Sequence, residues 1–191
     1  MKKTVLVALW GLFSVSSLWA AGITLTTSAN YYDFDADRSV VGDVAADPES
    51  YQDSGVYSLG IGYRWDNAWQ AELVYSSGDT GADIDGGSGV LAPVDIDMTQ
   101  VRLDALYHMS TDGDLRPYWV VGLGENKFEE PTIDRTETVL SYGTGFKHRL
   151  NDAAALRYEL RAVSSADAED TDLAFSIGLQ FTFLDRSADS E

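Results

Sequence analysis

Few side chains in this sequence could support covalent chemistry. The most suggestive pair is His108 and Ser110, two residues apart. A histidine that takes the proton of a nearby serine hydroxyl makes that serine a nucleophile, which is the chemistry of esterases and deacylases. At a membrane, such a pair would act on the acyl esters of lipid A. The other histidine is His148, and the absence of cysteine excludes disulfides and thiol catalysis.

Carboxylates are the second group with chemical potential. The run Asp83-Ile84-Asp85-Gly86 is similar to part of a calcium loop, but positions one and twelve of that loop would then be Gly81 and Ala92, which offer no ligand side chain. We therefore predict no metal and no cofactor site. The acidic residues are interpreted as solvated loops, with loose divalent-cation bridging to lipopolysaccharide left open. They are Asp33, Asp35, Asp37, Asp43, Asp47, Glu49, Asp53, Asp79, Asp83, Asp85 and Asp95.

A third group of charges alternates with apolar residues along the chain. A period of two is typical of a β-strand, whose successive side chains point to opposite faces. The group contains both signs, so its members can neutralise one another on a shared buried face. We predict a structural charge network with no catalytic role, made of Arg64, Glu72, Arg102, Asp104, Lys147, Arg149, Arg157, Glu159 and Arg161.

The elements that must position these charges are strands. The clearest is Leu173–Phe183, where six large apolar residues occupy one parity and small or polar residues the other. Asp66-Asn67 and Asn151-Asp152 favour tight turns. The same alternation predicts eight strands over residues 23–32, 56–65, 68–76, 98–109, 116–128, 137–150, 153–163 and 173–183.

The connections between these strands alternate in length. Those after the second, fourth and sixth strands are short, whereas 33–55, 77–97, 129–136 and 164–172 are longer. Short turns at one rim and long loops at the other are typical of bacterial outer-membrane barrels, whose strand number is even. We therefore predict an all-β fold, an eight-stranded antiparallel up-and-down transmembrane β-barrel. A soluble lipocalin-like barrel would need an apolar interior and a wet exterior, which is the opposite pattern.

The N-terminus predicts export. Lys2 and Lys3 precede the uncharged apolar stretch Val5–Leu18, and Ala20 offers a small residue for cleavage. The expected organisation is a signal peptide at 1–20, a barrel at 21–184 and a short acidic tail at 185–191. The net charge of −18 excludes a nucleic-acid binder, which would need the opposite sign.

Aromatic residues fall near both ends of the predicted strands. Rings with a polar edge favour the headgroup layer, so two aromatic belts are expected. The short-turn belt would hold Trp65, Trp69, Tyr107, Trp119 and Phe183, and the long-loop belt Tyr31, Tyr57, Tyr75 and Phe128.

Two stretches carry a family resemblance. Gly60-Ile61-Gly62-Tyr63-Arg64-Trp65 and Leu103-Asp104-Ala105-Leu106-Tyr107-His108, the latter followed by Leu115-Arg116-Pro117-Tyr118, resemble the N-terminal barrel of the OmpA/OprF group of outer-membrane proteins. The resemblance implies a barrel with both termini in the periplasm and extracellular long loops. It also implies that the terminal aromatic Phe183 is read by the outer-membrane assembly machinery. Many relatives continue into a peptidoglycan-binding domain, for which the eight residues after Phe183 are too short.

These expectations favour a non-catalytic barrel that supports outer-membrane integrity. Its expected partners are outer-membrane lipid and lipopolysaccharide, and it is expected to be a monomer. A narrow porin-like channel is the alternative, because glycines could widen the lumen locally, although eight strands leave an interior that side chains can fill. A lipid A-modifying enzyme is less favoured, because the predicted topology places His108 and His148 at the periplasmic rim, away from the outer leaflet.

Overall fold

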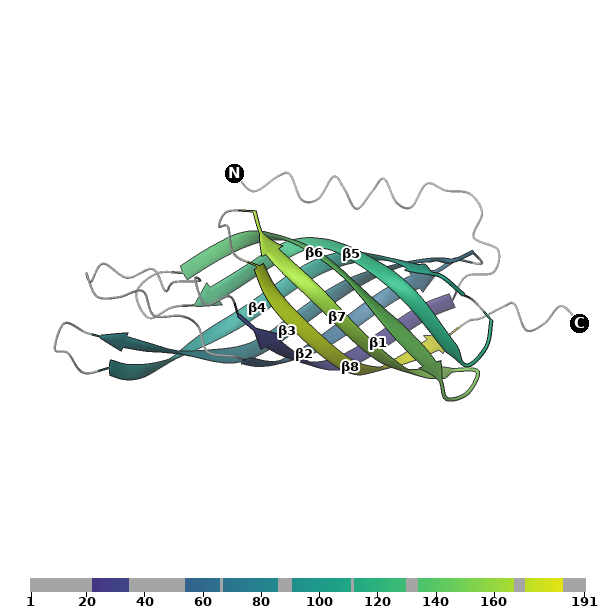
Figure 1. The fold of residues 1–191 in the computed structure, drawn as a ribbon, viewed down its shortest axis with the longest axis horizontal. Coiled ribbons are helices and arrows are strands. Elements are labelled where there is room, and N and C mark those ends of the chain that lie inside the picture. Colours follow the sequence, from purple (N-terminus) through teal and green to yellow (C-terminus); the bar gives the residue numbers. More distant parts are fainter. Residues whose placement is uncertain are drawn as a thin grey trace, which may run out of the picture.

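The computed structural model describes residues 22–34, 54–65, 67–85, 91–110, 112–129, 134–166 and 171–183. They form eight strands in which each pairs antiparallel with the next and the last closes on the first (Figure 1). The strands are β1 (Gly22–Asp33), β2 (Ser54–Arg64), β3 (Trp69–Asp85), β4 (Leu91–His108), β5 (Leu115–Glu129), β6 (Asp134–Arg149), β7 (Ala154–Ser165) and β8 (Thr171–Phe183). The predicted fold class is confirmed. The predicted leader at 1–20 and tail at 185–191 lie outside the described residues.

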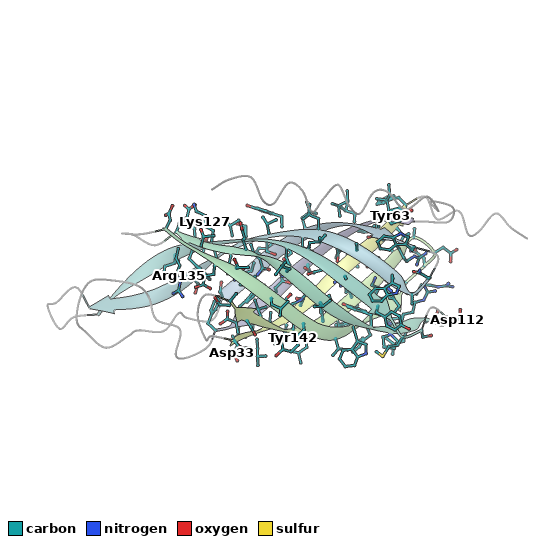
Figure 2. All side chains as sticks on the ribbon, turned by 90° about the horizontal axis from the view of Figure 1, so that it is seen from above. Asp33, Tyr63, Asp112, Lys127, Arg135 and Tyr142 are labelled. Carbon is teal, nitrogen blue, oxygen red and sulfur yellow. The ribbon has the colours of Figure 1, made fainter. Side chains whose placement is uncertain are left out.

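Residues that alternate in the sequence lie alternately on the outer and inner faces of the barrel wall. In β8, Leu173, Phe175, Ile177 and Leu179 are exposed on the outside, whereas Ala174 and Gln180 are buried inside. The same holds around the barrel, where Tyr142 on β6 points outward and is 54% exposed (Figure 2). A continuous apolar exterior of this kind suits lipid and not water. No helix among the described segments has the length and apolarity to cross a membrane.

Short connections at one rim are built by local turn chemistry. The side-chain oxygen of Asn67 accepts a hydrogen bond from the Trp69 amide at 2.9 Å, and Asn151 does the same for the Ala153 amide. Asparagine favours such turns because its short side chain mimics a backbone carbonyl. Gly113, between β4 and β5, has a φ of 84°, a left-handed conformation that glycine adopts without strain.

The opposite rim differs from the prediction. Residues 77–85 and 91–97, expected in a loop, continue β3 and β4 as a paired hairpin from Ser77↔Thr99 to Asp85↔Leu91. This hairpin extends farther than the neighbouring strands (Figure 1). The connections after β3, β5 and β7 shrink to residues 86–90, 130–133 and 166–170. Outside a membrane neither face needs to be apolar, so the strands continue without the hydrophobic alternation that identified them.

Because of the register, each row of paired residues lies farther from the short-turn rim on each successive strand. Trp69 is the first residue of β3, and its row runs through Tyr107 of β4, Trp119 of β5 and Thr144 of β6. Trp119 is the fifth residue from the short-turn end of its strand, and Thr144 is the sixth from that end of β6. This stagger is the geometric consequence of closing tilted strands into a barrel. Trp69, Tyr107 and Trp119 point outward, as the predicted short-turn belt requires.

Candidate functional site in the barrel lumen

Six buried charges form one continuous chain of ion pairs across the lumen. In order of contact they are Glu72, Arg157, Glu159, Arg161, Asp104 and Arg102, and none is more than 7% exposed. The successive N···O distances are 2.6, 2.7, 2.6, 3.0 and 2.7 Å. Acids and bases alternate, so three carboxylates neutralise three guanidinium groups. A buried charge is tolerable only when paired in this way.

Strand β7 supplies the centre of this chain. Arg157, Glu159 and Arg161 share the inward parity, so the carboxylate lies between two guanidinium groups on one strand face. Arg157 reaches across the lumen to Glu72 of β3, and Arg161 reaches Asp104 of β4. Alternation alone does not decide whether Arg157, Arg161 or Lys147 pairs with Glu159. In the structure the first two contact it.

Neutral side chains complete the network, and the alternation of charged and apolar residues does not predict them. Arg157 Nε donates to Tyr118 Oη at 2.8 Å, and the Tyr118 hydroxyl donates to Glu159 Oε2 at 2.8 Å. Arg161 Nη1 donates to Ser141 Oγ at 2.8 Å. Tyr118 has the inward parity and is fully buried. That parity was the available signal, because a phenol pointing into a charged lumen needs a polar partner.

The remaining predicted charges lie nearer the short-turn rim. The Lys147 ammonium is buried and donates to Gln70 Oε1 at 2.7 Å, apart from the six-residue chain. Arg64 is half-buried at the end of β2. Arg149 corrects the prediction, because it is exposed, with Asp114 and Asp152 oxygens 3.7 and 3.8 Å away. Its parity is that of the inward residues, but β6 ends at this residue, so the barrel does not enclose its side chain.

Glycines give the charged side chains their room. A Cβ atom on Gly122 would lie 2.0 Å from Asp104 Oδ1, and one on Gly145 would lie 2.5 Å from Tyr118 Oη. Inward glycines such as these are the sequence feature that favours the alternative of a widened pore. The space beside them is filled by Asp104 and Tyr118 from neighbouring strands, so these glycines accommodate the network.

We expect Gly122→Ala to lower the free energy of unfolding by about 1–3 kcal/mol, the usual cost of overpacking a filled interior. The new methyl group would displace Asp104 from Arg102 and Arg161. Urea unfolding in lipid vesicles measures the change. Gly55→Ala is the matched control, because nothing lies within 4 Å of that Cβ position. Equal stabilities of the two variants would show that the network can relax around a methyl group.

The lumen is not polar throughout, although the sequence pattern predicts a charged inner face. Toward the rim of the β3–β4 hairpin, inward side chains from seven strands and Phe34 form an apolar cluster. Phe128, predicted in the outer aromatic belt, is fully buried there and meets the ring of Phe34 at 6.4 Å. Its parity matches Tyr118, so it faces inward. The cluster contains Tyr32, Phe34, Val56, Ile96, Met98, Phe128, Val139, Val163 and Ala174.

A small cavity lies between the ion-pair chain and the strands that carry short polar residues. Its volume is about 20 Å³, and Ser28, Ser58 and Gly178 contribute to its walls. Glu72 belongs to the same lining, and its Oε1 atom has no hydrogen-bond partner among the described residues. A cavity needs roughly 10–15 Å³ to hold one water. The space therefore suits a single solvating water and is far smaller than a diffusion path.

The two residues with catalytic spacing do not act on each other. A ring nitrogen of His108 lies 3.0 Å from the Ala68 carbonyl, and the Ser110 hydroxyl donates to the Asp112 carbonyl at 3.1 Å. The described segments also contain no group of three or more acidic or histidine side chains arranged to hold a metal ion. Asp83 and Asp85, considered for calcium, have side chains outside the described set.

The sequence matches the family model described as the outer membrane protein beta-barrel domain over residues 5–183. Among solved structures it resembles OprG of Pseudomonas aeruginosa, with 15% identity, a TM-score of 0.64 and coverage of 86% of this chain and 97% of that one. It also resembles Neisserial surface protein A, with 15% identity, a TM-score of 0.60 and coverage of 86% and 100%. The N-terminal barrel of P. aeruginosa OprF has 19% identity, a TM-score of 0.55 and coverage of 84% and 97%. At these identities the likeness shows the fold alone. No curated protein matches the sequence.

Proposed function

Because the chain belongs to the outer membrane protein beta-barrel domain family, we propose that it is a non-catalytic, structural barrel with a sealed lumen. The observation that supports this role is the neutral chain of six buried charges that spans the interior from β3 through β7 to β4. A diffusion channel needs a continuous watery path, whereas these side chains pair with one another. Such a barrel contributes a rigid, lipid-embedded wall to the outer membrane, in contact with its lipids and lipopolysaccharide, as a monomer.

Two different layers support the sealed state. The charged layer occupies the middle of the lumen, and the apolar cluster around Phe128, Ile96 and Met98 lies between it and the hairpin rim. Water and ions avoid a narrow apolar constriction because nothing there replaces their hydration. A porin-like channel would need both layers to open together.

We expect the purified full-length protein to produce no steady current steps in planar bilayers, even at high protein load. The physical reason is that an ion would have to break the paired charges of one layer and cross the apolar side chains of the other. A porin of known conductance, reconstituted in the same bilayers, controls for insertion. Reproducible unitary openings that scale with the amount of folded protein would refute the sealed barrel and favour the narrow channel.

For orientation, we propose that the short turns face the periplasm and the β3–β4 hairpin faces the cell exterior. Both termini would then lie in the periplasm, where Phe183 could be presented to the assembly machinery. The support is the asymmetry of the two rims (Figure 2), with Asp112 at one end and Lys127 and Arg135 toward the other. Short periplasmic turns and longer extracellular extensions are the rule for such barrels.

Cysteines introduced singly at Asp43, Asp85, Asn67 and Asn151 test this orientation. The first two should react with a membrane-impermeant maleimide in intact cells, and the last two only after the outer membrane is permeabilised. The natural chain has no cysteine, so the unsubstituted protein should not be labelled. The reverse pattern, or equal labelling of all four, would overturn the proposed topology.

A further inference from the structure

A groove crosses the outer surface of the barrel near the short-turn rim. Its volume is about 580 Å³, and its walls come from strands β3 to β6 and from Trp65 and Asn67 at the β2–β3 turn. Apart from Asn67 at the rim, the exposed side chains along it are apolar, including Leu103, Leu123 and Leu140. This volume falls within the range of pockets that bind small molecules. The groove lies in the apolar, membrane-facing surface.

Two alanines create the hollow. Ala71 and Ala105 are direct neighbours in the register, and Val121 follows them in the same row. The row above holds leucines, Leu73↔Leu103↔Leu123↔Leu140, and the row below holds Trp69↔Tyr107↔Trp119. Small side chains between two rows of large ones leave a trough whose floor is close to the backbone. The trough therefore follows the hydrogen-bonded row.

The trough rises into the membrane because the rows climb. Ala71 is the third residue from the short-turn end of β3, and Val121 is the seventh from that end of β5. Four positions at about 3.3 Å each, on strands tilted by about 45°, give roughly 9 Å of height. That is more than half of one leaflet, since the hydrocarbon core is about 30 Å thick.

We propose that this groove binds one acyl chain of a phospholipid. The chain would lie over Ala71 and Ala105, with its end against Leu123 and Leu140. Its headgroup would lie at the rim beside Trp65 and Asn67, where indole rings and amides suit the interface. The choice of the phospholipid leaflet over the lipopolysaccharide leaflet rests on the orientation proposed above.

A second copy of the chain fits the groove poorly. Two copies related by a two-fold axis would meet through the same patch, so hollow would face hollow over Ala71 and Ala105. The space would stay unfilled, and the dispersion contacts of its lining would be lost. An acyl chain is narrow and flexible, so it can follow a trough that two convex walls cannot fill.

The test uses the full-length protein in vesicles of phosphatidylethanolamine and phosphatidylglycerol with a trace of phosphatidylethanolamine carrying a diazirine in one acyl chain. After illumination, mass spectrometry maps the labelled peptides. We expect labelling around Ala71, Ala105 and Val121 to exceed severalfold that on the outward faces of β1 and β8. Ala71→Leu and Ala105→Leu, made singly, should each reduce the groove labelling severalfold.

Ala29→Leu on β1 and Ala162→Leu on β7 are the matched controls, because both alanines face outward and neither lines the groove. They should leave the groove labelling unchanged, and far-ultraviolet circular dichroism verifies that each variant is folded. Even labelling around the barrel, or retention of groove labelling in both filled variants, would refute the resident chain. Absence of lipid adducts in the groove, together with a dimer joined through β3 and β4 when a bifunctional crosslinker is added to the same vesicles, would assign the groove to a second copy. The vesicle result does not depend on orientation in cells, so failure of the topology test remains distinguishable.

Discussion

Replacement of Glu159 by glutamine is expected to lower the free energy of unfolding by about 3–5 kcal/mol, because it leaves buried guanidinium charge without its counter-ion. Glu159 lies at the centre of the lumen, 2.7 Å from Arg157 and 2.6 Å from Arg161. It also accepts the hydrogen bond of the Tyr118 hydroxyl. Reversible urea unfolding from lipid vesicles measures the loss.

The order of contacts along the ion-pair chain specifies which second substitution restores stability. Glu159→Gln with Arg161→Gln leaves two intact pairs, Glu72–Arg157 and Asp104–Arg102. That double variant should recover part of the loss. Glu159→Gln with Arg157→Gln leaves Glu72 without a guanidinium partner in the six-residue chain, and it should recover less. Equal stabilities of the two double variants would contradict the chain of pairs, because only the net charge would then matter.

The second large effect is expected on the lipid face. Ile177 lies at the centre of β8, points outward and pairs with Ala29 and Tyr158. Ile177→Arg should cost about 2–4 kcal/mol, the range measured for arginine facing the middle of a bilayer. The same unfolding experiment measures it.

Gln180→Ala on the same strand is the control. Gln180 is buried inside, and its side-chain oxygen has no hydrogen-bond partner among the described residues, so its removal should cost much less. A cost for Gln180→Ala that matches the cost for Ile177→Arg would mean that the two faces of β8 are assigned the wrong way round.

The sequence predicted the parity of the strands well, for a physical reason. A lipid-facing side chain must be apolar and its neighbour faces the lumen, so alternation alone placed Glu72, Glu159 and Arg161 inside. Parity does not supply register across strands, so it could not show that Arg157 reaches Glu72 and that Lys147 binds Gln70 instead. Those contacts depend on the stagger that barrel closure imposes.

The misjudged positions lie at the ends of the strands, where the lipid constraint ends. Residues 77–85 and 91–97 continue as strands without apolar alternation, so the sequence pattern predicts a loop there. The position of Phe128 near a strand end predicts an aromatic belt residue, whereas its parity turns the ring inward to the apolar cluster. Arg149 has the inward parity at a point where the lumen has ended. At each of these positions the environment differs from the lipid exterior and polar lumen that the alternation assumes.

Closure of the sheet has a consequence for the order of events during folding. The seam joins the first and last strands, from Ile23↔Phe183 to Asp33↔Leu173, so its partners are separated by most of the chain. Contacts of such long sequence separation form slowly, because the intervening chain must be ordered first. Until β8 arrives, β1 and β7 are open edges that can pair with another chain. Formation of the seam is therefore expected late in folding, and it is the step that removes the open edges of β1 and β7.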